Sequence, residues 1–198
     1  MKMEIKNQVL YFFQEITIVV IGVLIAVSIG NYKEKLDNEQ YIKKTLLAIE
    51  NDIKLSQRSV DTVLSKHIDQ FNEIQEIVEE GGNELSLGEL VASLGGFQVA
   101  STGNISLRFF ISNKAELLEY ELISQLLEIE QRADLLATKL TMLSEYAYEH
   151  VNESDEEVLI KFFYLLANVI DSEEGLLEAY SEFLENNSEY LEKSKAQK

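Results

Sequence analysis

The sequence contains no cysteine, no proline and no tryptophan among its 198 residues. The lack of cysteine excludes disulfides and thiolate metal sites, and it leaves the cellular compartment undecided. The lack of proline, together with plentiful leucine, glutamate, isoleucine, alanine and lysine, favours long helices. Histidine is scarce as well, with only His67 and His150 present. These absences predict an all-α protein and leave few side chains for metal or nucleophilic chemistry.

Basic side chains are also few, and the acidic excess is unevenly placed. Residues 1–58 hold eight Lys+Arg and seven Asp+Glu, which leaves nine basic and 28 acidic side chains in the rest of the chain. The net charge of −19 after residue 58 repels phosphate backbones, which argues against nucleic-acid binding. The same charge disfavours contact with anionic lipid, so this part of the chain should stand off a bilayer.

The longest apolar stretch, residues 9–32, is interpreted as a single transmembrane helix. No charged residue lies between Ile16 and Gly30. At a rise of about 1.5 Å per residue this run covers only about 22 Å, so residues 9–13 are needed to cross a hydrocarbon core of about 30 Å. Membrane lipid is therefore an expected partner.

The apolar stretch has two other possible interpretations. A cleaved signal peptide is one, because Lys2 and Lys6 precede the apolar run, but no A-x-A-like cleavage site follows it. A buried helix of a soluble protein is the other, but β-branched residues on every face would leave such a helix without a polar side. Both are weaker than a membrane anchor.

Small residues recur every four positions in this helix, at Gly22, Ala26 and Gly30. This spacing places them on one stripe, where two membrane helices can approach closely. Glu15 lies seven residues before Gly22 and projects from nearly the same face, as expected of an ionisable residue that faces a helix interface. Alternatively, Glu15 sits at headgroup level beside an aromatic belt formed by residues 11–13.

The anchor resembles one known family. The run from Gln14 to Ala26, followed by residues 31–34, is similar to the Gly-Glu-Ile…Val-Ile-Gly-Ile-Leu-Ile-Ala-Leu anchor and Asn-Asn-Trp-Asn-Glu of DUF6090, a family of uncharacterised single-pass membrane proteins from Bacteroidetes. Residues 101–105 with 113–117 resemble that family's Ser-Ser-Gly-x-Leu…Asn-Lys-Glu-Leu. The sequence departs from the family at Tyr32, at Gln14 and in its shorter basic N-terminal arm. The resemblance supports the anchor and implies no reaction.

Four segments are expected: a short tail over residues 1–8, the transmembrane helix over 9–32, an acidic helical-bundle domain over 33–192 and a polar tail over 193–198. The resemblance implies a bacterial inner membrane with the domain in the periplasm. The lysines that follow the anchor, counted by the positive-inside rule, favour the opposite orientation.

The domain is predicted to be an antiparallel bundle of about four long helices. An apolar stripe from Ile42 to Val78 predicts an amphipathic helix over residues 38–80 that ends at 81–83. Ser86 with Glu89 predicts a capped short helix to about Leu94, which Gly95-Gly96 ends.

Residues 97–112 show no clear period. The stretch 102–104 is expected to form a turn, and 105–111 a strand or a further helical turn.

The remaining helices are predicted from caps and heptads. Asn113 with Glu116 is expected to open a coiled-coil-like helix whose stripe begins at Leu122 and ends at His150. Ser154 with Glu157 is expected to cap the next helix, and Ser172 to begin the last.

No motif predicts an enzyme, a cofactor or a metal. His67 and His150 fall on apolar stripes without H-E-x-x-H or E-x-x-H spacing, so buried or helix-capping roles are expected. Arg108 stands among apolar residues and is expected either to pair with a carboxylate or to belong to a partner-binding loop formed by Gly103, Arg108, Phe109 and Phe110.

The favoured function is a membrane-anchored scaffold or adaptor that acts through protein contacts, as a homo-oligomer or as a subunit of a membrane complex. One alternative is an ion- or proton-conducting or motor-type subunit that uses Glu15. Another is a membrane-tethered sensor with a pocket between its helices.

Overall fold

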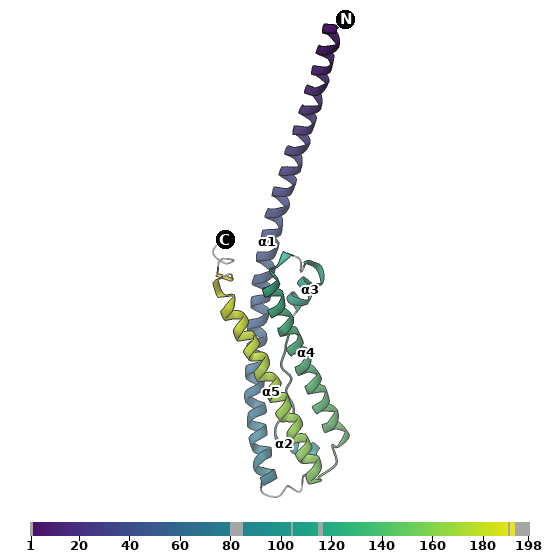
Figure 1. Cartoon of the computed structure of the whole chain (residues 1–198). Helices are drawn as coiled ribbons and strands as arrows, with labels where there is room; N and C mark the ends of the chain where they lie inside the picture. The colour runs from purple at the N-terminus through teal and green to yellow at the C-terminus, as the bar shows by residue number, and fades with distance from the viewer. Residues whose placement is uncertain (1, 80–84, 104, 115–116, 190, 193–198) are drawn as a thin grey trace. The chain divides into compact units, whose positions relative to one another are not determined.

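The computed structural model of the chain describes residues 2–79, 85–103, 105–114, 117–189 and 191–192. Within these ranges it contains five α-helices and no strand (Figure 1). They are α1 (Lys2–Glu79), α2 (Leu87–Ser93), α3 (Ile105–Lys114), α4 (Tyr120–Glu149) and α5 (Glu156–Asn186). The all-α prediction is confirmed, with three long helices and two short ones in place of about four long ones.

The chain divides into two compact units, Met1–Lys44 and Thr45–Lys198. The first consists of the N-terminal part of α1, which is helical through Gly30 and Asn31. Its apolar side chains are exposed, including Ile18 (63%), Val19 (65%) and Leu24 (60%). Within the described residues, α1 is the one helix that is long and apolar enough to span a membrane.

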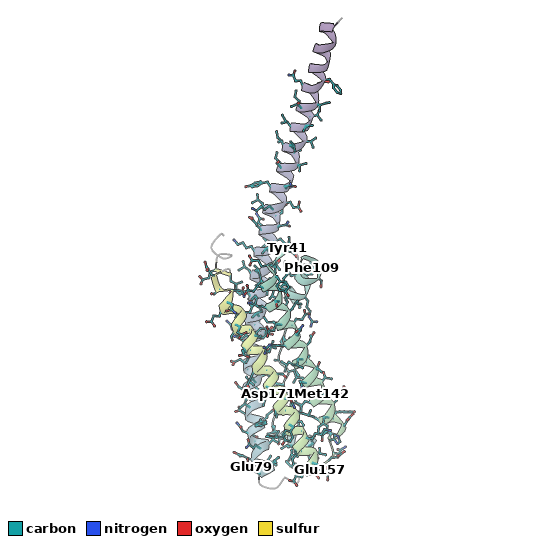
Figure 2. All side chains as sticks on the ribbon, in the orientation of Figure 1. Tyr41, Glu79, Phe109, Met142, Glu157 and Asp171 are labelled. Atoms are coloured by element: carbon teal, nitrogen blue, oxygen red, sulfur yellow. The ribbon has the colours of Figure 1, made fainter. Side chains whose placement is uncertain are left out.

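The second unit is built mainly from residues 45–79 of α1 together with α4 and α5. Helices α4 and α5 lie side by side (Figure 1), and α1 contacts α5 through Gln57, which donates to Ser181. Figure 2 shows Glu79 and Glu157 at one end of this unit and Phe109 at the other. The core comes from the predicted apolar stripes. From α1 it includes Leu46, Ile49, Ile53, Val60 and Ile74; from α4, Leu122, Leu126, Ile129, Ala133, Leu136, Leu140 and Leu143; from α5, Val158, Phe162, Leu166, Val169, Leu176 and Tyr180.

The short helix α2 follows its predicted caps. The Ser86 backbone N–H and the Ser86 hydroxyl each donate to Glu89 Oε2 at 2.9 Å, and these two hydrogen bonds lower the pKa of the Glu89 carboxyl. The Glu89 N–H donates in return to Ser86 Oγ. Beyond Leu94, the backbone takes positive φ at Gly95 (86°) and Gly96 (74°), which L-residues rarely adopt. The predicted capping box and glycine stop are both confirmed.

The irregular stretch ends in a helix. Of the two possibilities for residues 105–111, the structure has the helical one, α3, with Leu107 and Phe110 each 1% exposed. The Ser106 N–H donates to Asp52 Oδ2 at 3.1 Å and ties the start of α3 to α1 within the second unit. Asn104 of the predicted turn lies outside the described residues.

Three predicted helix starts are wrong. Asn113 belongs to α3, which ends at Lys114, and α4 begins at Tyr120. Glu116 lies outside the described residues. The N-cap of α5 is Asp155, one residue after Ser154, and it makes no side-chain cap hydrogen bond.

The third wrong start is Ser172, which lies inside α5. Its hydroxyl donates to the Asn168 carbonyl one turn earlier at 2.8 Å, which satisfies the hydroxyl without ending the helix. The predicted helix stop at residues 81–83 and the polar tail at 193–198 fall outside the described residues.

Candidate functional site

The small-residue stripe of the first unit is open. A Cβ added at Gly22 or Gly30 would meet nothing within 4 Å, and the side chains of Glu15 and Ala26 are exposed. On another face, Ser28 donates its hydroxyl to the Leu24 carbonyl at 2.7 Å, so this polar group is satisfied within the helix. Another helix could therefore approach the α1 backbone closely along the stripe without displacing any contact at the two glycines.

The residues expected to form a partner loop are split by the structure. Arg108 lies on α3, where Nη2 donates to Asp134 Oδ1 at 2.7 Å and Nε lies 3.1 Å from Glu130 Oε1. The expected pairing of Arg108 with a carboxylate is therefore confirmed, and it joins α3 to α4. Gly103 and Phe109 are exposed, whereas Phe110 is buried in the core. Phe110 thus cannot belong to a partner surface.

A buried polar pair joins α1 to α5, and sequence reasoning found only half of it. His67 Nδ1 lies 3.0 Å from Glu173 Oε2, and both side chains are 0% exposed. The other two polar atoms, His67 Nε2 and Glu173 Oε1, are buried without a hydrogen-bond partner. The expected buried role of His67 is confirmed. Glu173 was missed because its place on the α5 stripe, between Val169 and Leu176, was assigned to the start of a new helix.

Two further sets of polar side chains lie on α1, one against the end of α2 and the other on the seam with α5. Gln70 donates its side-chain amide to the carbonyls of Leu94 and Gly96, at 3.0 and 2.9 Å, and so holds the end of α2 against α1. Burial raises the pKa of Tyr180 to about 12, and the nearby Ser56 hydroxyl opposes this to a smaller extent. Ser56 is itself buried, so the seam between α1 and α5 carries polar side chains at several levels.

His150 occupies the C-cap of α4. Its ring lies 4.4 Å from that of Tyr146, and Nδ1 lies 3.0 Å from Glu153 Oε2, within ion-pair distance but without hydrogen-bond geometry. A protonated imidazole at this position would also interact favourably with the helix dipole. The expected helix-end role of His150 is confirmed, and its neighbours form no nucleophile–base arrangement.

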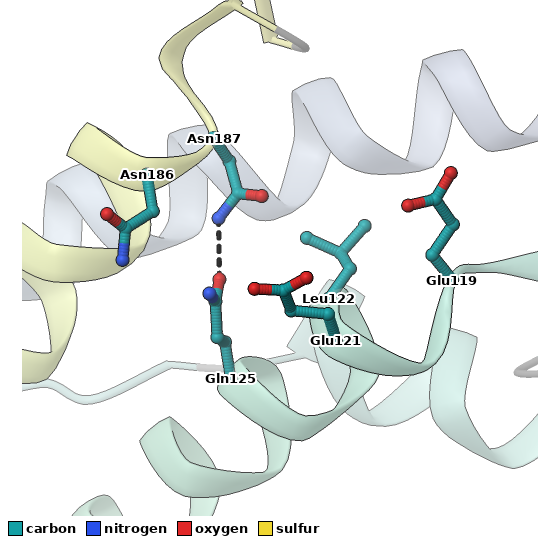
Figure 3. Close-up of a pocket in the computed structure, with 6 residues that line it drawn as sticks. All are labelled: Glu119, Glu121, Leu122, Gln125, Asn186 and Asn187. Atoms are coloured by element: carbon teal, nitrogen blue, oxygen red, sulfur yellow. Dashed lines mark hydrogen bonds between the residues drawn. The ribbon is translucent and has the colours of Figure 1, made fainter.

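The surface hollows of the second unit are shallow. One of about 170 Å³ lies where α4 begins and α5 ends; Figure 3 shows Asn187 bonded to Gln125 there, beside Glu119 and Glu121. Another, of about 380 Å³, lies between the extended residues 99–102 and the face of α4 that carries Leu136 and Leu140. Over the described ranges, no three His, Asp or Glu side chains are grouped closely enough to hold a metal ion.

Comparison of the chain with protein-family models, with curated proteins and with solved structures finds no match. Over the residues that the structure describes, the fold defines an all-helical protein with one candidate membrane-spanning helix near its N-terminus.

Proposed function

We propose that this protein is a single-pass membrane scaffold or adaptor that acts through protein contacts, as a homo-oligomer or as a subunit of a membrane complex. Residues 9–32 would anchor it in a bacterial inner membrane, and the acidic part would fold as an antiparallel bundle in the periplasm. The resemblance to the DUF6090 family supports this placement. The proposal assigns the protein no reaction and no cofactor.

The observation that carries the proposal is the exposed apolar face of α1. Between Ile16 and Ile29 its large aliphatic side chains are 43 to 65% exposed, and burial of such surface is what drives segments out of water. A helix that is apolar on every side has no polar face for water, so lipid and other helices are its natural surroundings. Its backbone satisfies its own hydrogen bonds, as a membrane span requires.

The partner-binding element of the proposal is the stripe of Gly22, Ala26 and Gly30. In lipid the hydrophobic effect does not drive helices together, so close backbone contact and interhelical hydrogen bonds must do so. The open space around both glycines supports such an approach. Glu15, on nearly the same face, would add a hydrogen bond across the interface, contributing roughly 0.6–2 kcal/mol.

Membrane placement is tested by extraction. We expect the intact chain to remain in the membrane fraction through high salt and alkaline carbonate, because a spanning helix is not displaced by charge. Release of the intact chain by carbonate would refute the anchor, since a peripheral acidic protein washes off under those conditions.

Assembly is tested by Gly22→Ile with Gly30→Ile, which adds bulk along the stripe. The full chain in mild detergent should then run as a smaller species on a sizing column. The matched control is Thr17→Ile with Ser28→Ile, which adds aliphatic bulk on the opposite face and should leave the size unchanged. If the stripe variant elutes with wild type, the stripe faces lipid and this interface is wrong.

Glu15 favours one second candidate, an ion- or proton-conducting subunit in which several copies line a shared path. A carboxylate within an apolar span is a common mark of such paths. Glu15→Gln separates the two, because a scaffold keeps its size and partners after this change whereas a conducting subunit loses ion or proton flux in proteoliposomes.

A further inference from the structure

Buried polar side chains distinguish the seam between α1 and α5 from the interior face of α4. From Leu122 to Leu143 every buried residue of α4 is aliphatic. The seam, by contrast, carries buried Ser56 and His67 on α1 and buried Glu173 on α5. Polar groups at interior positions of paired helices weaken packing, and their best-attested use is to select one alignment of the helices.

The contacts along this seam define a single register. Phe71 stacks on Phe163 with ring centroids 4.2 Å apart, His67 meets Glu173 at 3.0 Å, and Gln57 Nε2 donates to Ser181 Oγ at 3.0 Å. Residue numbers fall along α1 as they rise along α5, so each residue of one helix has a defined level on the other.

Apolar packing alone would distinguish this register only weakly from one displaced by seven residues. Both stripes repeat with the heptad, so such a displacement again places apolar residues opposite apolar residues. Counting seven residues from the observed pairing brings Glu173 level with Val60 in one direction and with Ile74 in the other. Both residues are 0% exposed, so the carboxylate would be buried against aliphatic carbon without His67.

We propose that the His67–Glu173 pair is the device that fixes the register of α5 on α1. Each partner keeps one buried polar atom without a hydrogen bond. The pair therefore adds little to the stability of the observed register, because the cost of burying these two atoms offsets the bond that it forms. Its effect is greatest on the displaced registers, because in each of them Glu173 loses the partner that it has in the described structure. The inference does not depend on the proposed function.

The test uses engineered disulfides in the full chain, which has no cysteine of its own. Gln57→Cys is combined in turn with Ser181→Cys for the observed register, and with Glu174→Cys or Ser188→Cys for the two displaced ones. Cross-linking is run at redox equilibrium in mild detergent, and each product is quantified by mass spectrometry of the digested chain.

In the wild-type background, the 57–181 product should exceed either displaced product by more than about a hundred-fold, because an unpaired buried charge disfavours displacement by at least that much. With His67→Leu and Glu173→Leu together, the seam becomes apolar and we expect displaced products within about ten-fold of the 57–181 product. If the double leucine variant retains the wild-type ratio, the register is set elsewhere and the proposal is overturned.

Two further variants keep the result interpretable. Ser56→Ala with Tyr180→Phe removes polar atoms from a neighbouring layer of the same seam and should retain the wild-type ratio. His67→Gln with Glu173→Gln keeps two polar side chains that can hydrogen bond to each other, and the 57–181 product should still be the main one, whether or not the leucine variant folds, because displacement would break that bond inside the core. Displaced products in the glutamine variant, or equal displacement in the Ser56/Tyr180 control, would each contradict a specific role for this pair.

Discussion

Replacing His67 alone should destabilise the second unit far more than replacing both members of the buried His67–Glu173 pair. After His67→Leu, the Glu173 carboxyl remains 0% exposed without its imidazole partner. It must stay charged in the core or take up a proton, which for an ordinary glutamate at pH 7 costs about 3.7 kcal/mol. Because protonation is always open to the carboxyl, the cost of leaving Glu173 without a partner cannot exceed the cost of protonation. We therefore expect a loss of about 3 kcal/mol in the free energy of unfolding, near the lower end for broken buried pairs.

The reverse replacement should be milder. After Glu173→Leu the imidazole of His67 remains buried without its partner, and the loss is that of a buried polar group left unbonded, about 1–2 kcal/mol. The double variant buries two leucines and no charge, and we expect it to lie within about 1 kcal/mol of wild type or above it. The sum of the two single losses should therefore exceed the loss in the double variant by about 3 kcal/mol or more.

The measurement is urea unfolding of the full chain in mild non-ionic detergent, followed by far-UV circular dichroism. A helix held in the micelle contributes a constant signal, so the transition reports the second unit. The reasoning is refuted if the double variant is destabilised by the sum of the two single losses. That result would mean that each side chain acts through contacts other than the pair.

Three further predictions concern other parts of the second unit. Gly88→Ala should reduce the free energy of unfolding in urea by about 1–3 kcal/mol, because the added Cβ would lie 2.5 Å from Val151 Cγ2 and 2.7 Å from the Val151 carbonyl oxygen. An unchanged urea midpoint would contradict this packing. The neutral Tyr180 side chain contributes stability that is complete below about pH 10 and is lost as the pH rises through a pKa of about 12. Tyr180→Phe should therefore make the free energy of unfolding fall less steeply with pH above about pH 10. Arg108→Ala should cost only about 0.5–1 kcal/mol, because Arg108 and Asp134 are both more than half exposed; a larger loss would mean that the arginine stem, and not its charge, holds α3.

Short-range patterns predicted the helical class, the apolar stripes and the caps of α2 correctly. Ser86 and Glu89 lie one helical turn apart, so their mutual hydrogen bonds depend on a few neighbouring residues. The stripes follow from the helical period, which places Leu126, Ile129 and Leu136 on one face whatever they pack against. The pairing of Arg108 with a carboxylate was also foreseen, because a guanidinium among apolar residues needs a partner.

Tertiary contacts decided where helices begin and which polar residues are buried. Ser172 is compatible with an N-cap and with a helix interior, and the choice depends on whether Glu173 finds a buried partner on another helix. That partner, His67, is 106 residues away in the sequence, so no local pattern identifies the pair. Asn113 lies within α3, whose Leu107 and Phe110 are buried in the core of the second unit. Spacing along one helix is fixed by backbone geometry alone, whereas the matching of positions on two helices exists only once they pack.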